Sequence, residues 1–285
     1  MPSESCRAWA GCPRTARASI LGVMHRFEPS LHERVWGVTD LRPWIGLHDL
    51  ERPVGEAWYQ SPGLPLLKWI FTTERLSVQV HPNDDYAWLH HNSAGKTEAW
   101  HVVHVDPGAE LGIGLRRDLT REQAREAALD GSIESLLNWI PVRKGDTVFI
   151  PAGTIHAIGA GLVIAEIQQD SDVTYRLYDY GRGRELHLDR GLEVSDLRAW
   201  NGAIRRGGPV LAECPYFRLE SIEGGEGATA GPYPAPAWIV FPSGEGTIGG
   251  ETWRQGDVWM LDAGEAARVE SGGAGFLAGF IPPGS

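Results

Sequence analysis

With 285 residues, 42% of them hydrophobic and 22% charged, the chain is long enough to bury a full core and has the composition of a globular protein. The formal net charge of -11 opposes binding to nucleic acid and to anionic membranes, and no apolar run approaches the roughly 20 residues that span a bilayer. We therefore expect a small-molecule ligand, with no nucleic-acid and no membrane partner, while the oligomeric state is left open.

The first 23 residues differ in character from the rest of the chain. They are richer in arginine than in acidic residues and lack the apolar segment of a secretory signal, so export is not supported. Cys6 and Cys12 lie here and Cys214 lies far away, which is neither a disulfide framework nor a CxxC zinc pattern and fits a reducing cytoplasm. We predict a cytoplasmic protein in which residues 1–23 are a disordered extension or are not part of the native protein.

The following chain has the pattern of short β-strands. The 36 glycines and 19 prolines of the full chain are spread along the sequence, which favours many strands joined by turns. Within a first strand segment, 67–80, apolar and polar residues alternate toward the end, so Ser77, Gln79 and His81 share one face. Further strands are predicted over 98–105, 146–150, 161–169 and 173–181.

One helical insertion interrupts the strands at about 118–140. Thr120 and Gln123 have the spacing of a capping box, and Gly131 breaks the helical pattern that follows them. From about residue 201 the composition shifts toward glycine, proline and alanine. We expect a small helical cap on a first domain over 24–200, and a second, smaller β-domain over 201–285.

The segment GDTVFIPAGTIHAI, residues 145–158, carries the strongest chemical signal. Gly145, Pro151, Gly153 and His156 have a spacing that resembles the second motif of the cupin superfamily, a jelly roll (double-stranded β-helix) whose pocket binds a metal. The glycines and the proline shape the turns, after which the histidine re-enters the barrel with its ring inward. The predicted fold class is therefore mainly β, a cupin jelly roll, and the alternative for the histidine is an ordinary core residue.

Three other residues are candidate ligands of the same metal. Gln79 and His81 are two residues apart on one strand and so project from one face, and Glu98 lies on the following strand. With His156 they provide oxygen and nitrogen donors suited to a divalent ion such as zinc. Ordinary cupins carry His-x-His in the first motif, whereas here a glutamine replaces the first histidine.

Four segments, LSVQVHPNDDYA, GKTEAW, PAGTIHAI and SDVTYRLYDYGR, resemble the corresponding stretches of type I mannose-6-phosphate isomerase in its short bacterial form. The resemblance covers about residues 27–193, beginning with ERVWG and ending with RELHL. It implies zinc held by Gln79, His81, Glu98 and His156 next to a cavity for a phosphorylated sugar. It also implies interconversion of mannose 6-phosphate and fructose 6-phosphate, an aldose-ketose isomerisation.

That isomerisation needs a base beside a carbonyl and a cation that stabilises the resulting cis-enediolate. Lys96 and Arg176 match basic positions of the family's active site, where they would bind the phosphate and take part in catalysis. Glu166 matches an acidic position and would carry the proton, or it is an exposed strand carboxylate paired with a surface base. Ser77 would donate to the phosphate, or it is a plain sheet hydroxyl. Zinc would polarise the sugar oxygens or mainly hold the site in shape.

The segment GGETWRQGDVWMLDAGEAARV, near the C-terminus, looks like a second copy of the metal motif. Gly256, Asp262 and Gly264 repeat its spacing, but Ala267 stands where the histidine would fall. We interpret 201–285 as a degenerate cupin-like domain without a metal. One active site and one zinc ion per chain are therefore expected.

Five other histidines are not expected to bind the metal. They are His90 and His91, in a long loop after His81, His101 and His104, on the strand of Glu98, and His187. At the start of that loop Asp84 and Asp85 are predicted to form a turn.

Two alternatives to the isomerase stay open. One is a cupin metal-dependent oxygenase, which Gln79 disfavours because such sites favour three histidines with a carboxylate. The other is a non-catalytic sugar-phosphate-binding protein that keeps the pocket without turnover.

Overall fold

The computed structural model describes residues 24–283, so the extension predicted over residues 1–23 lies outside the described part. Strands dominate this part of the chain, as predicted. The elements of its first two thirds are β1 (Met24–Phe27), β2 (Ser30–Val38), β3 (Val54–Tyr59), β4 (Leu66–Thr72), β5 (Val78–Val80), α1 (Asp84–His91), β6 (Glu98–Val105), β7 (Glu110–Leu115), α2 (Arg121–Asp130), α3 (Ile133–Leu136), β8 (Leu137–Pro141), β9 (Asp146–Ile150), β10 (His156–Ile158), β11 (Leu162–Gln168), β12 (Tyr175–Tyr178) and α4 (Leu188–Val194). The elements that follow are β13 (Ile204–Arg206), β14 (Val210–Cys214), β15 (Phe217–Ile222), β16 (Thr229–Ala230), β17 (Ala237–Val240), β18 (Glu245–Ile248), β19 (Glu251–Arg254), β20 (Val258–Leu261), β21 (Ala267–Glu270) and β22 (Phe276–Phe280).

Two sheets form a first β-barrel of the cupin type. One has the strand order β13-β9-β6-β11-β4-β3-β2, and the other has the order β12-β5-β10-β7-β8. Apolar side chains from both sheets pack between them, for example Trp100 and Ile164 from the larger sheet against Ile113 from the smaller one. Every pairing within these sheets is antiparallel, and some paired strands are far apart in the sequence, such as β4 and β11.

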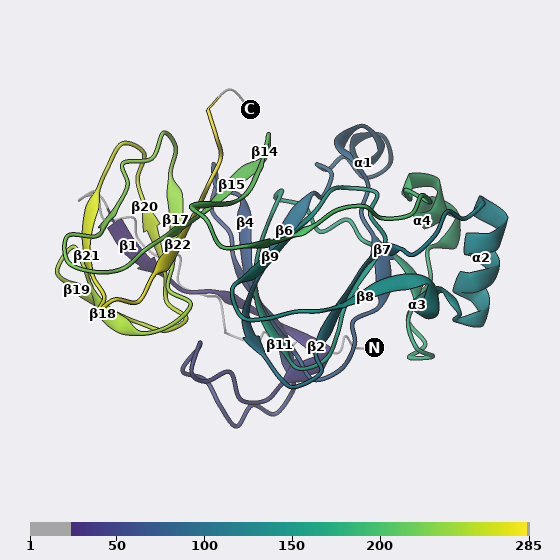
Figure 1. Ribbon diagram of the computed structural model, residues 1–285, viewed down its shortest axis with the longest axis horizontal. Coiled ribbons are helices and arrows are strands. Elements are labelled where there is room, and N and C mark those ends of the chain that lie inside the picture. Colours follow the sequence, from purple (N-terminus) through teal and green to yellow (C-terminus); the bar gives the residue numbers. More distant parts are fainter. Residues whose placement is uncertain (1–23, 284–285) are drawn as a thin grey trace, which may run out of the picture.

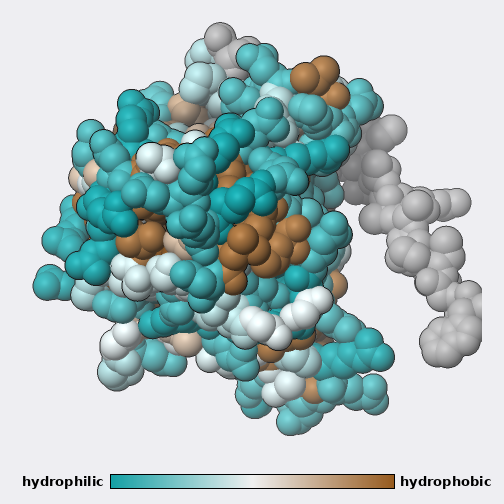
Figure 2. Space-filling view, turned by 90° about the vertical axis from the view of Figure 1, so that its right-hand side faces the viewer, coloured by the Kyte–Doolittle hydropathy of each residue, from teal (hydrophilic) through white to brown (hydrophobic). Residues whose placement is uncertain are grey.

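Helices α2, α3 and α4 lie at the end of the molecule away from the C-terminal strands (Figure 1). The predicted capping box is confirmed, since Thr120 and Gln123 exchange side-chain and backbone hydrogen bonds at the start of α2. Gly131 ends this helix with a φ of 83°, a left-handed conformation that glycine adopts without strain. The face that carries these helices is largely hydrophilic, broken by separate hydrophobic groups (Figure 2). No helix of the described residues is both long and apolar enough to cross a membrane.

A second β-unit contains the remaining strands. Its sheets have the orders β1-β20-β17-β22-β15-β14 and β16-β21-β18-β19, and aromatic rings such as Phe241 and Trp253, stacked at 3.9 Å, fill the space between them. Two strands cross the domain boundary that was predicted between residues 200 and 201. β1 belongs to this second unit through its pairing with β20, whereas β13 pairs with β9 of the first barrel.

The turn of the metal motif recurs in the second unit. Asp146 accepts a hydrogen bond from the backbone of Arg143 at 3.0 Å, and Asp257 accepts one from Arg254 at the same distance. Ala267 opens β21 just as His156 opens β10. The local geometry of a cupin motif is therefore present in the second unit, with a methyl group in place of the imidazole.

Two predictions about local structure were wrong. The loop expected after His81 contains helix α1, in which Asp84 and Asp85 form the first turn and Asn83 caps it by accepting from the backbone of Tyr86. The segment predicted as one strand, 67–80, is two strands of opposite sheets, β4 and β5. The strands predicted at 98–105 and 146–150 are confirmed with those bounds, while β11 and β12 are shorter than predicted.

Candidate metal centre

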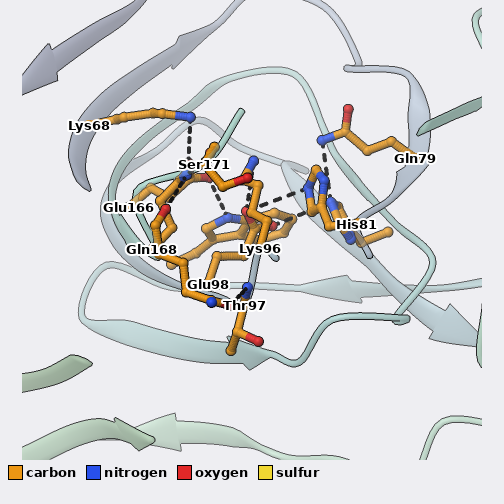
Figure 3. Close-up of polar contacts among 12 residues, drawn as sticks. Lys68, Gln79, His81, Lys96, Thr97, Glu98, Glu166, Gln168 and Ser171 are labelled. Carbon is orange, nitrogen blue, oxygen red and sulfur yellow. Dashed lines mark hydrogen bonds and ion pairs between the residues drawn. The ribbon is translucent and has the colours of Figure 1, made fainter. Parts of the chain in front are cut away.

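Three side chains with metal-ligand chemistry converge inside the first barrel, from three different strands. His81 follows β5, Glu98 opens β6 and His156 opens β10. A donor atom of each lies within 4.8 Å of the others, and all three side chains are buried. The carboxylate of Glu98 faces both rings, with Oε1 3.3 Å from His156 Nε2 and Oε2 3.6 Å from His81 Nε2 (Figure 3). Within residues 24–283 this is the one cluster of three histidine, cysteine or acidic side chains with such spacing.

Backbone carbonyls orient both imidazole rings. The Nδ1 atom of His81 donates to the carbonyl of Val173 at 3.0 Å, and that of His156 donates to the carbonyl of Thr154 at 2.9 Å. Because a carbonyl only accepts, the proton of each neutral ring lies on Nδ1 and the lone pair on Nε2. Burial lowers the pKa of His156 to about 4 and that of His81 well below its ordinary value. Both rings are therefore neutral near pH 7 and present lone pairs to Glu98.

Three of the four atoms that face one another in this cluster lack hydrogen bonds. Nε2 of His81 and both carboxylate oxygens of Glu98 are buried without a hydrogen-bond partner, although the ammonium of Lys96 lies 3.1 Å from Glu98 Oε2. Burial raises the pKa of Glu98, and Lys96 opposes this rise. Leaving a buried polar group unpaired costs about 1–3 kcal/mol. A divalent cation coordinated by these atoms would satisfy them, so the residues present fit such an ion.

Gln79, the fourth predicted ligand, lies beside His156 on the neighbouring strand. Its amide Nε2 is 3.3 Å from His156 Nε2, and its Oε1 accepts from the hydroxyl of Ser77 at 3.4 Å. Rotation of the terminal amide exchanges its nitrogen and oxygen, because that torsion is broad and nearly two-fold. The side chain can therefore present an oxygen ligand to the cluster without any change in its backbone.

A cavity of about 470 Å³ opens beside the cluster. Four of the predicted site residues lie in its wall, namely Ser77, Gln79, Lys96 and Arg176. The wall also contains residues that the sequence analysis missed, among them Arg34, Trp36, Glu56, Lys68, Asp172 and Arg184. The other predicted residues, His81, Glu98, His156 and Glu166, are outside this lining and almost fully buried. The cavity is thus rich in positive charge, with the metal-ligand cluster behind its wall.

Glu166 is buried in an ion pair with Lys68. Its Oε1 lies 3.2 Å from the ammonium of Lys68, and its Oε2 accepts from the indole of Trp100 at 2.8 Å. Both partners are its direct neighbours across β11, one on β4 and one on β6. Burial opposes ionisation of Glu166, but Lys68 and Lys96 lower its pKa below the ordinary value. The alternative that Glu166 is an exposed strand carboxylate is therefore wrong.

Among the three arginines in the cavity wall, Arg176 is the one without an acidic hydrogen-bond partner. Arg34 forms two hydrogen bonds with Glu56, at 3.2 and 2.9 Å, and Arg184 donates to Asp179 at 2.7 Å. Arg176 donates from Nη1 to the backbone carbonyl of residue 185 at 2.9 Å, while its Nε is buried without a partner. Its positive charge is therefore available to an anion in the cavity.

A signal for one of the missed residues was present in the sequence. Lys68 is a single lysine within the apolar strand LLKWIFT, and a lysine is almost never fully buried unless it is paired. Arg34 and Trp36 belong to the ERVWG segment, although nothing in that segment indicates which way its side chains point. The place of Glu56 depends on the pairing of β3 with β4, which the local pattern does not contain, and Asp172 lies in the loop between β11 and β12.

The remaining histidines lie apart from the ligand cluster. His101 is buried on β6 against the hydroxyl of Thr147, at 2.9 Å, and His104 pairs with Asp106 at the surface. His91 is in α1 and contacts the hydroxyl of Tyr175 at 2.5 Å.

The facing sheets and the buried His-Glu-His cluster define a cupin with a candidate metal centre. The mannose-6-phosphate isomerase of Streptococcus mutans is 32% identical to the chain over 241 residues, which cover 67% of this chain and 76% of that protein. The chain belongs to the mannose-6-phosphate isomerase family. No family model matches the chain.

Solved structures have the same fold. The crystal structure of the mannose 6-phosphate isomerase from Bacillus subtilis matches with a TM-score of 0.81 at 22% identity, over 92% of this chain and 100% of that one. A mannose 6-phosphate isomerase bound with zinc and yttrium matches with a TM-score of 0.73 at 14% identity, over 91% and 99% of the two chains. The predicted fold class, mainly β and of the cupin type, is thus confirmed.

Proposed function

We propose that the protein is a zinc-dependent aldose-ketose isomerase that interconverts mannose 6-phosphate and fructose 6-phosphate. The observation that carries this proposal is the buried cluster of His81, Glu98 and His156 beside a cavity whose wall presents Lys96 and Arg176. Membership of the isomerase family supports the same reaction.

One zinc ion per chain would be held by His81, Glu98, His156 and the amide oxygen of Gln79. This donor set, two imidazole nitrogens and two oxygens, is suited to zinc. When bound, zinc would supply positive charge that polarises a sugar oxygen or fixes the shape of the site.

The phosphate of the substrate would be bound by Arg176. Its guanidinium has no acidic hydrogen-bond partner, and its planar fork matches two phosphate oxygens at once. The hydroxyl of Ser77 lies in the same wall and would add a neutral donor.

Proton transfer between C1 and C2 would depend on two charged groups next to the cluster. Burial favours the neutral amine of Lys96, but Glu98 and Glu166 raise its pKa, so the side chain is a cation that can stabilise a cis-enediolate. Glu166 is ionised and is the predicted proton carrier. Glu166 is outside the cavity lining, and Lys68, 3.2 Å from Glu166, lies in the wall next to it.

A coupled assay for fructose 6-phosphate, supplied with mannose 6-phosphate, tests the proposal on the purified full chain. We expect turnover that a chelator abolishes and that added zinc restores. Mannose without the phosphate is the matched control for phosphate binding by Arg176. It should turn over far more slowly, because Arg176 then has no anion to bind.

The two alternatives predict different results in the same preparation. A protein that retains zinc and binds mannose 6-phosphate without turnover would be a sugar-phosphate-binding protein. Iron in place of zinc, together with oxygen consumption, would indicate an oxygenase. Either result would overturn the proposed isomerase.

A further inference from the structure

Arg176 lies on a strand that forms one edge of its sheet. β12 pairs with β5 on one side, where Arg176 is opposite Gln79, and it is the last strand of that sheet on the other side. An edge strand presents backbone N–H and C=O groups that need partners. The position of the guanidinium in the cavity depends on how this outer edge is held.

Both outer backbone groups of Arg176 are bound by a single residue, His187. The backbone N–H of His187 donates to the carbonyl of Arg176 at 2.7 Å, and the backbone N–H of Arg176 donates to the ring Nδ1 of His187 at 3.1 Å. Two residues earlier, the carbonyl of Glu185 accepts from the Arg176 guanidinium at 2.9 Å. The segment 185–187 therefore holds Arg176 at its backbone and at its side chain.

The ring of His187 can perform this task in one protonation state only. Its Nδ1 must carry a lone pair, so the proton of the neutral ring lies on Nε2. The groups around the ring are the guanidiniums of Arg176 and Arg190, the Glu185 carboxylate, 3.9 Å from Nε2, and the ring of Tyr175. Burial and the charge of Arg176 lower the pKa of His187, which agrees with a neutral ring.

We propose that His187 is a positioning residue for the phosphate anchor, because its imidazole replaces a missing strand neighbour at the backbone of Arg176. Substrate affinity then depends on a side chain that lies outside the cavity lining and acts through Arg176. This inference rests on the proposed function insofar as Arg176 binds the substrate's phosphate.

The test compares three full-length proteins: the wild type, His187→Ala and His187→Asn. The oxygen of asparagine occupies about the place of Nδ1 and accepts the same hydrogen bond, whereas alanine leaves the N–H of Arg176 unpaired. We expect His187→Ala to raise KM about five- to tenfold, the effect of one lost hydrogen bond, with kcat nearly unchanged. His187→Asn should stay within about twofold of the wild type. Equal KM values in all three proteins, or equal losses in both variants, would overturn the inference.

Two controls separate a positioning role from a general loss of structure. His104→Ala removes an exposed histidine that pairs with Asp106 at the surface, and it should change neither KM nor thermal stability. Nitrogen-15 NMR of the histidine rings should show His187 with its proton on Nε2, assigned by the signal that His187→Asn lacks. A proton on Nδ1 would contradict the inference.

Failure of the proposed function would be visible separately. A wild type without turnover of mannose 6-phosphate refutes the isomerase by itself. Calorimetric binding of inorganic phosphate to the same three proteins then decides the role of His187. The inference predicts weaker binding in His187→Ala and wild-type binding in His187→Asn, and equal binding in all three would overturn it.

Discussion

Gln79 and His156 are direct partners across the pairing of β5 with β10, and their side-chain Nε2 atoms lie 3.3 Å apart. On its other side, Gln79 is the partner of Arg176 on β12. β5, a strand of three residues, thus lies between His156, a predicted metal ligand, and Arg176, the residue predicted to bind the phosphate. A shift of β5 would move the metal centre and the phosphate site together.

Replacing His156 by alanine should remove bound zinc and activity together, because the three remaining ligands would hold the ion poorly. We expect kcat to fall at least about 100-fold, with zinc content well below one ion per chain. Metal analysis and the coupled assay on the same sample check this. His104→Ala is the matched control, and full activity in a metal-free His156→Ala protein would contradict the assigned site.

Lys96→Ala should separate the metal from the reaction. The histidine rings keep their carbonyl partners in this variant, so zinc should remain bound. Turnover should fall about 100-fold, as it does when one charge-stabilising donor is removed from an active site. Zinc content and steady-state kinetics measure the two effects independently, and unchanged kinetics would remove Lys96 from the site.

The ion pair between Lys68 and Glu166 should be important for stability. Both side chains are buried, so Lys68→Met would leave the Glu166 carboxylate without its ion-pair partner and should lower the free energy of unfolding by about 3–5 kcal/mol. The double variant Lys68→Met, Glu166→Gln should recover part of this loss, because the buried charge is gone. Urea unfolding of the three proteins measures whether stability is highest in the wild type, lower in the double variant and lowest in Lys68→Met. A Lys68→Met protein as stable as the wild type would refute the prediction.

His101 should make the fold sensitive to acid. Burial lowers its pKa from 6.5 to about 4, so between these values the unfolded chain binds a proton that the folded chain does not. Stability from this residue is complete above about pH 6.5, is lost as the pH falls toward 4, and changes no further below that. Over this interval the loss of stability amounts to about 3 kcal/mol.

His101→Asn provides the comparison for that prediction. Asparagine retains a hydrogen-bond partner for Thr147 but does not titrate, while the other histidines are present in both proteins. The free energy of unfolding of the wild type should therefore fall more steeply between pH 6.5 and 4 than that of the variant. Parallel pH profiles would show that His101 has no such effect.

The sequence by itself determined that strands dominate the fold, and the predicted bounds of two of them, β6 and β9, are confirmed. Residues two apart on a strand share a face, which grouped Gln79 with His81, whereas the choice of His156 rested on the resemblance of its segment to the second cupin motif. The same local rules predicted the capping box of α2 at Thr120. They failed at α1, where Asp84 and Asp85 form the first turn of a helix rather than an isolated turn.

Tertiary structure alone decided which charges face one another. Glu166 is buried because β11 places it between Lys68 and Trp100, two residues from distant parts of the chain. Arg176 keeps a free charge because Arg34 and Arg184, also in the cavity wall, each have an acidic partner of their own. Spacing along a strand determines which face a side chain occupies. Its partner on the next strand depends on the register between segments that can be far apart in the chain, such as β1 and β20, and the local sequence does not contain that register.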